Sequence, residues 1–205
     1  MSLSLVVITD GEHLDNLKKT IDSVADLVQE KVIVYQGTDE SVYAQIQALA
    51  DFSVFTTPKG NADLDRNFAY GITTQEWILA LDDDEWVPQE TKSFMAQIMT
   101  SKTDIVWFNF KNLVDGVDIK DILGDDPHPR LWRRRDGVIN WPNQAHTFPQ
   151  FGSPLHYFST LEIIHDRKYG ELFARHEKRA KMMDPANVDL EKRFIGALKQ
   201  KLGKK

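Results

Sequence analysis

Four consecutive carboxylates, Asp82, Asp83, Asp84 and Glu85, have the type and spacing to bind a metal ion. Two carboxylates about 4 Å apart repel by about 4 kcal/mol at an effective dielectric constant of about 20. A divalent cation removes that repulsion, and hard oxygen ligands suit Mg²⁺ or Mn²⁺. The alternative is a solvated acidic turn before a helix that starts near Pro88, because acidic residues favour helix N-termini. This stretch alone does not decide between the two.

The acids follow a run of five apolar residues, 77–81, which is too short for a lone helix and shows no polar alternation. Such a run predicts a strand that is buried on both faces, as in a parallel sheet. Ligands of open α/β sheets bind at the carboxyl ends of such strands. If the strand continues through the acids, Asp82 and Asp84 share a face and can point at one ligand. We expect Glu85 to serve the entry of the next helix.

Strands and helices alternate around this run. Apolar runs predict strands at residues 3–8, 31–35, 53–56, 104–110, 130–133 and 138–141. Apolar residues at helical spacing predict helices at residues 15–28, 42–50, 63–71, 90–100 and from 171 to the end. The alternation predicts parallel βαβ units in an α/β fold. No repeat or linker divides the sequence, so we predict a single domain over residues 1–205.

Composition narrows the functional classes. The chain has 205 residues, a net charge of −6 and no cysteine, which excludes disulfides and thiolate sites and argues against general nucleic-acid binding. No apolar run approaches the roughly 18 residues of a membrane span. The start, MSLSLVVITD, lacks a basic leader and is typical of a strand. We therefore expect a cytoplasmic protein. Its basic C-terminal helix is expected to dock on the fold, with self-association or contact with the inner face of a membrane as alternatives.

Four segments in this order resemble family 2 glycosyltransferases of the GT-A fold, nearest to the branch with lipopolysaccharide-core and peptide glycosyltransferases. They are VVITDGEHLDNLKKTIDSV, LDRNFAYGITTQEWILALDDDEWVPQE, PRLWRRRDGVINWPNQAHTF and LEIIHDRKYGELFARHEKR. The resemblance implies a Rossmann-like, mixed and mostly parallel sheet flanked by helices, with a helical C-terminal tail. It further implies a nucleotide-binding half over about residues 1–100, an acceptor half over about 101–183 and a tail helix over about 187–205.

The implied activity is metal-dependent, inverting transfer of a sugar from a nucleotide-diphosphate sugar, most simply a UDP-sugar, to an acceptor hydroxyl. Nucleotide binding is then expected from Thr9, Asp10, Gln36, Asp39, Arg66, Asp82 and Asp83. The Mn²⁺ or Mg²⁺ ligands are expected to be Asp82, Asp84 and His165, with His146 as the rival of His165. The acceptor is unknown, and Arg130, Trp132 and Trp141 are the residues expected to meet it.

Two departures from the family pattern leave alternatives open. Tyr35 and Gln36 stand where the family places aspartates that hold the base, and Thr147 replaces the Glu of a His-Glu pair. His146 is therefore the best candidate for the general base, which needs a pKa near the working pH, and Asp136 and Asp126 are the alternatives. The alternatives to a transferase are a catalytically impaired nucleotide-sugar-binding protein and a nucleotidyltransferase.

Overall fold

The computed structural model describes residues 1–58, 62–142, 149–170, 172–174 and 185–204. Contacts group the chain into two compact units, one of residues 1–109 and 127–163 and one of residues 110–126 and 164–205. The first unit contains the acidic run and most of the sheet. Grouping by contacts does not establish independent folding, so the single domain stays a prediction.

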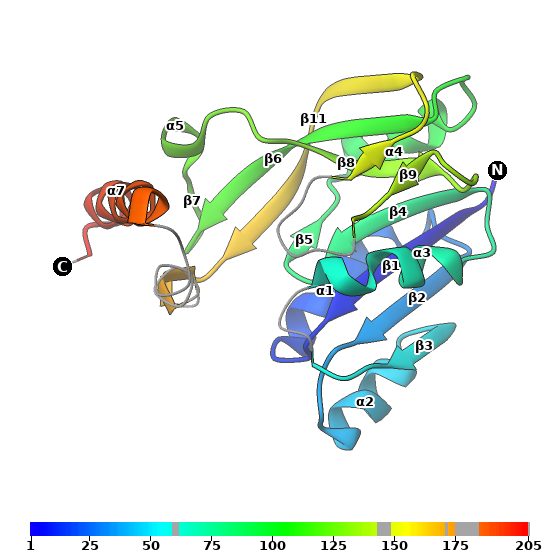
Figure 1. Ribbon diagram of the computed structural model, residues 1–205, viewed down its shortest axis with the longest axis horizontal. Coiled ribbons are helices and arrows are strands. Elements are labelled where there is room, and N and C mark those ends of the chain that lie inside the picture. The colour runs from blue at the N-terminus through cyan, green and yellow to red at the C-terminus, as the bar shows by residue number, and fades with distance from the viewer. Residues whose placement is uncertain (59–61, 143–148, 171, 175–184, 205) are drawn as a thin grey trace. The chain divides into compact units, whose positions relative to one another are not determined.

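Four parallel strands form one side of the sheet, and their carboxyl ends meet at one edge (Figure 1). These strands are β1 (Leu3–Thr9), β2 (Glu30–Tyr35), β3 (Phe52–Phe55) and β4 (Trp77–Asp82). They lie in the order β3-β2-β1-β4. The helices between them are α1 (Leu14–Val24), α2 (Glu40–Gln47) and α3 (Arg66–Gly71), which follows the 3₁₀ turn η1 (Ala62–Asp65).

Strand β4 is buried from Trp77 through Leu81, which confirms the predicted strand with two buried faces. One face carries Val6, Val32, Ile78 and Ala80 in a cluster with Tyr70 of α3. On the helices, Leu17 and Val24 of α1 are fully buried, as the helical spacing predicts. The mixed α/β sheet flanked by helices confirms the predicted fold class.

Beyond β4 the sheet becomes antiparallel. The further elements are β5 (Glu85–Trp86), α4 (Gln89–Ile98), β6 (Ile105–Val114), β8 (Pro127–Arg133) and β11 (His156–Arg167). The sheet continues β4-β8-β6-β11-β5, and a separate pair joins β9 (Ile139–Asn140) to β10 (Gln150–Phe151). Sequence analysis does not predict the 12-residue β11, because most of its side chains are exposed or half-buried and it contains no long apolar run.

The second unit contains the ends of β6 and β11 with β7 (Val117–Asp118), α5 (Lys120–Leu123) and α7 (Pro185–Leu202). Leu198 of α7 is buried in a cluster with Val114 and Ile119, and Phe194 and Leu202 pack against it. The tail thus docks within its own unit, as expected, although on α5 and the end of β6. Among the described residues, none of the helices is both long and apolar enough to cross a membrane.

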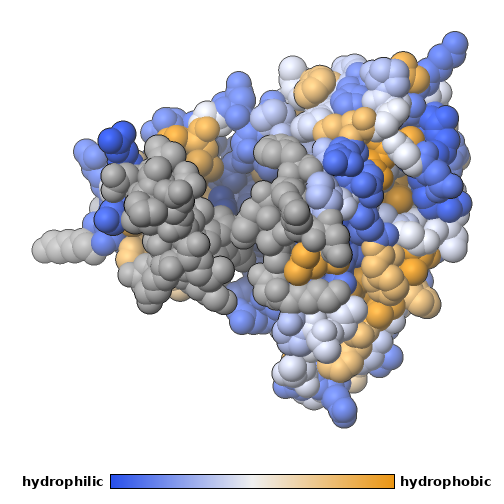
Figure 2. Space-filling view, in the orientation of Figure 1, coloured by the Kyte–Doolittle hydropathy of each residue, from blue (hydrophilic) through white to orange (hydrophobic). Residues whose placement is uncertain are grey.

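Hydrophobic side chains gather near the β3 edge of the sheet on the face seen in Figure 2. Tyr35, Tyr43 and Phe55 stack there, with ring centroids 5.3–6.0 Å apart. Tyr35 is buried, whereas Phe55 is 44% exposed. A Cβ placed on Gly37 would lie 2.0 Å from the Tyr35 ring, so this position requires glycine.

We expect Gly37→Ala to lower the free energy of unfolding by about 1–3 kcal/mol, because the added methyl group displaces a buried, stacked ring. Gly71→Ala is the matched control, since nothing lies within 4 Å of a Cβ at that position. Urea unfolding of both variants measures the difference. Equal stability of the two variants would contradict the tight packing of Tyr35.

Candidate functional site

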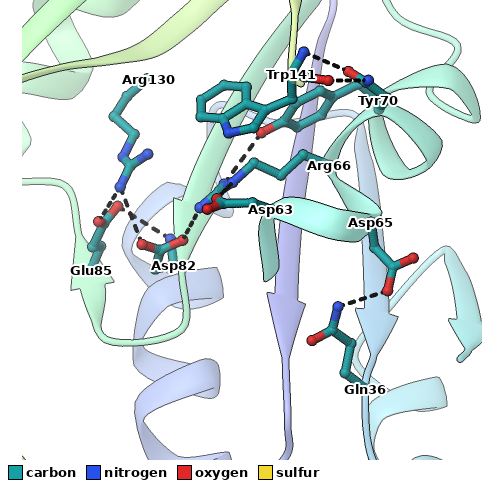
Figure 3. Close-up of polar contacts among 10 residues, drawn as sticks. Gln36, Asp63, Asp65, Arg66, Tyr70, Asp82, Glu85, Arg130 and Trp141 are labelled. Carbon is teal, nitrogen blue, oxygen red and sulfur yellow. Dashed lines mark hydrogen bonds and ion pairs between the residues drawn. The ribbon is translucent and has the colours of Figure 1, made fainter. Parts of the chain in front are cut away.

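Two buried arginines meet on one carboxylate at the carboxyl end of β4 (Figure 3). Arg66 Nη2 lies 3.2 Å from Asp82 Oδ1, and Arg130 Nη2 lies 3.2 Å from Asp82 Oδ2. Arg66 comes from α3 and Arg130 from β8, the antiparallel neighbour of β4. Both oxygens of Asp82 therefore bind guanidinium groups of this chain.

Arg66 also has a carboxylate partner on its own helical segment. Its Nε donates to Asp63 Oδ1 at 2.8 Å, and its Nη1 donates to the Tyr70 hydroxyl at 3.3 Å. Burial alone would lower the pKa of Arg66, but the electrostatic influence of Tyr70 and Asp82 and the bond to Asp63 hold it well above its ordinary value. The guanidinium is therefore a fixed positive charge. The ion pair with Asp63 and the contact with Asp82 therefore coexist on one guanidinium.

Arg130 has the same kind of partner in Glu85. Its Nη2 donates to Glu85 Oε1 at 2.5 Å, and the pair is buried from solvent. Burial opposes the charge of Arg130, yet Glu85 and Asp82 raise its pKa above the ordinary value. Our expectation for Glu85 is wrong, because α4 begins at Gln89 after Pro88 and Glu85 lies in β5. A buried acid needs a cation, which Arg130 supplies, and no local pattern of the sequence indicates that burial.

The middle acids form a turn rather than an extension of the strand. Strand β4 ends at Asp82, Asp83 and Asp84 form the turn, and β5 starts at Glu85. Alternation along a strand therefore cannot place Asp84 beside Asp82. The pKa of Asp83 is raised to about 7, chiefly by burial and further by the charges of Asp84, Asp10 and Asp82, although a hydrogen bond from Thr9 opposes the rise. The acids of the β1 and β4 ends thus repel one another.

The expected nucleotide residues lie at the ends of β1 and β2. Thr9 Oγ1 donates to Asp83 Oδ2 at 2.5 Å, and Asp10 is exposed in the following loop. Gln36 is buried and its Nε2 donates to Asp65 Oδ2 at 2.7 Å. Asp39 instead caps α2, accepting from Ser41 N at 2.8 Å and Val42 N at 3.2 Å. Sequence analysis missed Asp65, a buried acid directly before Arg66.

The residues expected to meet the acceptor are placed differently from one another. Trp132 is 1% exposed and packs edge-on against Tyr70, so its burial argues against the expected stacking on a sugar. Asp136 is exposed in the turn after β8. His165 lies on β11 in the second unit, and its role as a ligand stays a prediction. His146 and Thr147 lie outside the described residues.

Trp141 is held in place by the residue that follows Arg66. Asn67 Oδ1 accepts from Trp141 N at 2.8 Å, and Asn67 Nδ2 donates to Trp141 O at 2.6 Å. The Arg66 guanidinium lies 4.8 Å from the Trp141 ring centre. The indole is 6% exposed, and its Nε1 has no hydrogen-bond partner among the described residues. Arg66 thus forms an ion pair with Asp82, and Asn67 binds both backbone polar groups of Trp141.

The acids at the end of β4 can supply some, but not all, of the oxygen ligands that a hard divalent cation needs. Among the described residues, no three His, Asp or Glu side chains are grouped so that they could hold a metal ion. Mg²⁺ usually takes only one or two carboxylates and completes its shell with phosphate oxygens and water. The pKa of Asp83 is raised mainly by burial, and the nearby charges of Asp84, Asp10 and Asp82 add to the rise. Asp84 and its neighbours therefore fit a cation that arrives with a phosphate ligand.

The parallel sheet with charged residues at its carboxyl edge defines a Rossmann-like protein of the GT-A fold. The crystal structure of S. aureus TarS 1–349 is similar at a TM-score of 0.50 and 20% identity, over 65% of this chain and 47% of that chain. The structure of TarS 1–349 in complex with UDP gives a TM-score of 0.50 and 19% identity, over 65% and 47%. This chain thus spans about half the length of those structures, and the likeness shows the fold.

The family model described as glycosyl transferase family 2 matches residues 4–151. This match covers most of the chain and includes the carboxyl ends of β1, β2 and β4, so the chain belongs to glycosyl transferase family 2. A comparison with curated proteins finds no match. The finer lipopolysaccharide-core or peptide branch stays a prediction.

We expect Asp83→Asn to stabilise the free protein at pH 8 and to have no such effect at pH 4. The carboxyl has a pKa of about 7 in the folded chain against an ordinary 3.8, so folding favours its protonated form and stability falls as the pH rises between these values. The amide of the Asp83→Asn variant does not ionise, so above pH 7 the free energy of unfolding of the variant should exceed that of the wild type by roughly 1–3 kcal/mol. Unfolding curves at both pH values measure it.

Asp22→Asn is the control, because Asp22 is exposed on α1 and its replacement changes little. A gain of stability from Asp83→Asn that is the same at pH 4 and pH 8 would contradict the raised pKa.

Proposed function

We propose that this chain binds a nucleoside-diphosphate sugar at the carboxyl ends of β1, β2 and β4 and transfers the sugar to an acceptor hydroxyl. The observation that carries the proposal is the meeting of Arg66 and Arg130 on Asp82, at the edge where ligands of α/β sheets bind. Family membership supplies the reaction class. The similar TarS protein has been crystallised in complex with UDP, which supports a uridine nucleotide here.

The nucleoside would lie toward β2 and β3. Tyr35 is buried beneath its neighbours, so Phe55, exposed at the end of β3, is the aromatic face that we assign to the base. Gln36, Thr9 and Asp10 border the same edge at the ends of β2 and β1. In this placement the base would lie on Phe55, which stacks on Tyr35 and Tyr43.

The diphosphate would lie toward Arg66 and Arg130. A guanidinium grips phosphate oxygens with parallel hydrogen bonds, and fixed positive charges stabilise a leaving group that gathers negative charge. The Trp141 indole N–H would add a neutral donor beside Arg66. A cation held by Asp84, with Asp82 reached through water, would supply further neutralisation when bound.

The acceptor hydroxyl needs a base on the side of the sugar opposite the leaving diphosphate. Inversion at the sugar carbon follows from one such displacement. Asp136 and His146 stay the proposed bases. A cytoplasmic site of action is likewise a proposal.

We expect Asp84→Ala to weaken UDP binding in the presence of Mn²⁺ by at least about tenfold, which corresponds to a loss of about 1.4 kcal/mol. Binding without a divalent cation should not weaken, because the arginines remain and one negative charge beside the diphosphate has been removed. Calorimetric titration with UDP in Mn²⁺ and in EDTA measures both, and Asp22→Ala serves as the exposed control. An unchanged affinity in Mn²⁺ would exclude Asp84 as a ligand.

The reaction class has its own test. Incubation of the wild type with UDP-sugars should release UDP, whereas a nucleotidyltransferase would release pyrophosphate. Tight donor binding with neither product, under a broad range of acceptors, would favour the binding protein without catalysis.

A further inference from the structure

Glu85 is a carboxylate with no exposed surface at the edge where the substrate is proposed to bind. A buried acid is costly unless a cation and hydrogen bonds compensate it. The chain keeps this acid two residues after Asp83, within a run that is already crowded with negative charge. Such an arrangement calls for a reason beyond solubility or capping of a helix.

The two oxygens of Glu85 bind two different parts of the site. Oε1 accepts from Arg130 Nη2 at 2.5 Å, and Oε2 accepts from the backbone N–H of Asp82 at 3.2 Å. The side chain therefore closes the turn of the acids and holds the guanidinium that binds Asp82. Glu85 thus contacts both the backbone of Asp82 and the guanidinium of Arg130 that pairs with the Asp82 side chain (Figure 3).

The two arginines are held in the same way. Arg66 is 2.8 Å from Asp63 and 3.2 Å from Asp82, and Arg130 is 2.5 Å from Glu85 and 3.2 Å from Asp82. Each guanidinium thus has a close carboxylate of its own and shares Asp82 over a longer distance. An incoming anion can replace Asp82 while the close partner keeps the arginine in position.

We propose that Glu85 is a positioning residue that sets how much of the positive charge of Arg130 is offered to the diphosphate. It acts through Arg130 and does not itself touch the substrate. The inference rests on the proposed function, because it concerns the same donor site. Removing the charge of Glu85 while keeping its shape should leave Arg130 with one carboxylate fewer and make the site more attractive to an anion.

The test is a double-mutant cycle read by UDP binding in EDTA. Ligand-detected NMR suits the weak affinities that are expected without a divalent cation. Glu85→Gln should bind UDP about three to ten times more tightly than the wild type, because Arg130 then has one carboxylate fewer to compensate its charge. In the Arg130→Gln background, the same change at Glu85 should have a much smaller effect, because only its direct influence on the ligand remains. A merely structural residue would change binding equally in both backgrounds.

Glu76→Gln is the matched control, because Glu76 pairs with Arg133 at 2.6 Å in the same unit, away from the acidic run. It should leave UDP binding unchanged. If Glu85→Gln does not fold, Glu85→Asp keeps the charge but withdraws it from Arg130, and should tighten UDP binding to a smaller extent.

Unchanged or weaker UDP binding in the folded Glu85 variant overturns this inference, as does an equal effect with and without Arg130. A wild type that binds UDP neither in Mn²⁺ nor in EDTA overturns the proposed function with it. A wild type that binds UDP beside an inert Glu85→Gln overturns this inference alone.

Discussion

The shared carboxylate of Asp82 is the interaction on which the site depends. Its two oxygens join α3 and β8 to the end of β4 through Arg66 and Arg130. Inside a protein, charges interact far more strongly than in water, so a buried network holds its members only while each is compensated. Three carboxylates face two guanidiniums here, which leaves the network with a small excess of negative charge. The same ion pairs therefore fix the positions of the strand ends and determine the net charge of the site.

Helix α3 contacts both Asp82 and the residue Trp141, which follows β9. Arg66 binds Asp82, and the following residue, Asn67, holds both backbone polar groups of Trp141. Successive helical residues point in different directions, so one short helix contacts the acids and the segment that leads to residues 143–148. Adjacent residues of one helix thus contact Asp82 and Trp141.

The sequence is informative where a local pattern determines structure. The strands of the parallel half and the helices between them follow from apolar runs, and Asp82 stands out by the run of acids, whereas Arg66 is indicated by the resemblance to the family. Glu85 and Trp132 do not follow, because their burial depends on Arg130 and on the pairing of β4 with β8, which join residues far apart in the chain. Strand β11 is missed for the opposite reason, since it is largely accessible and has no strong apolar period. Asp84 does not share a strand face with Asp82 as predicted, because the strand ends at Asp82 and a turn begins at Asp83.

The charge of the proposed ligand explains why arginines and acids share one edge. A nucleoside diphosphate brings negative charge to a site whose own network already has an excess of carboxylate, and the neighbouring Asp83 and Asp10 add to it. Arginines alone would hold the phosphates but remain bound to Asp82, whereas acids alone would repel them. A cation beside Asp84 would resolve the conflict, because it would bind carboxylate and phosphate oxygens together and leave the guanidiniums available to the diphosphate. Donor binding and cation binding should then each strengthen the other, since neither charge is well compensated without its counterpart.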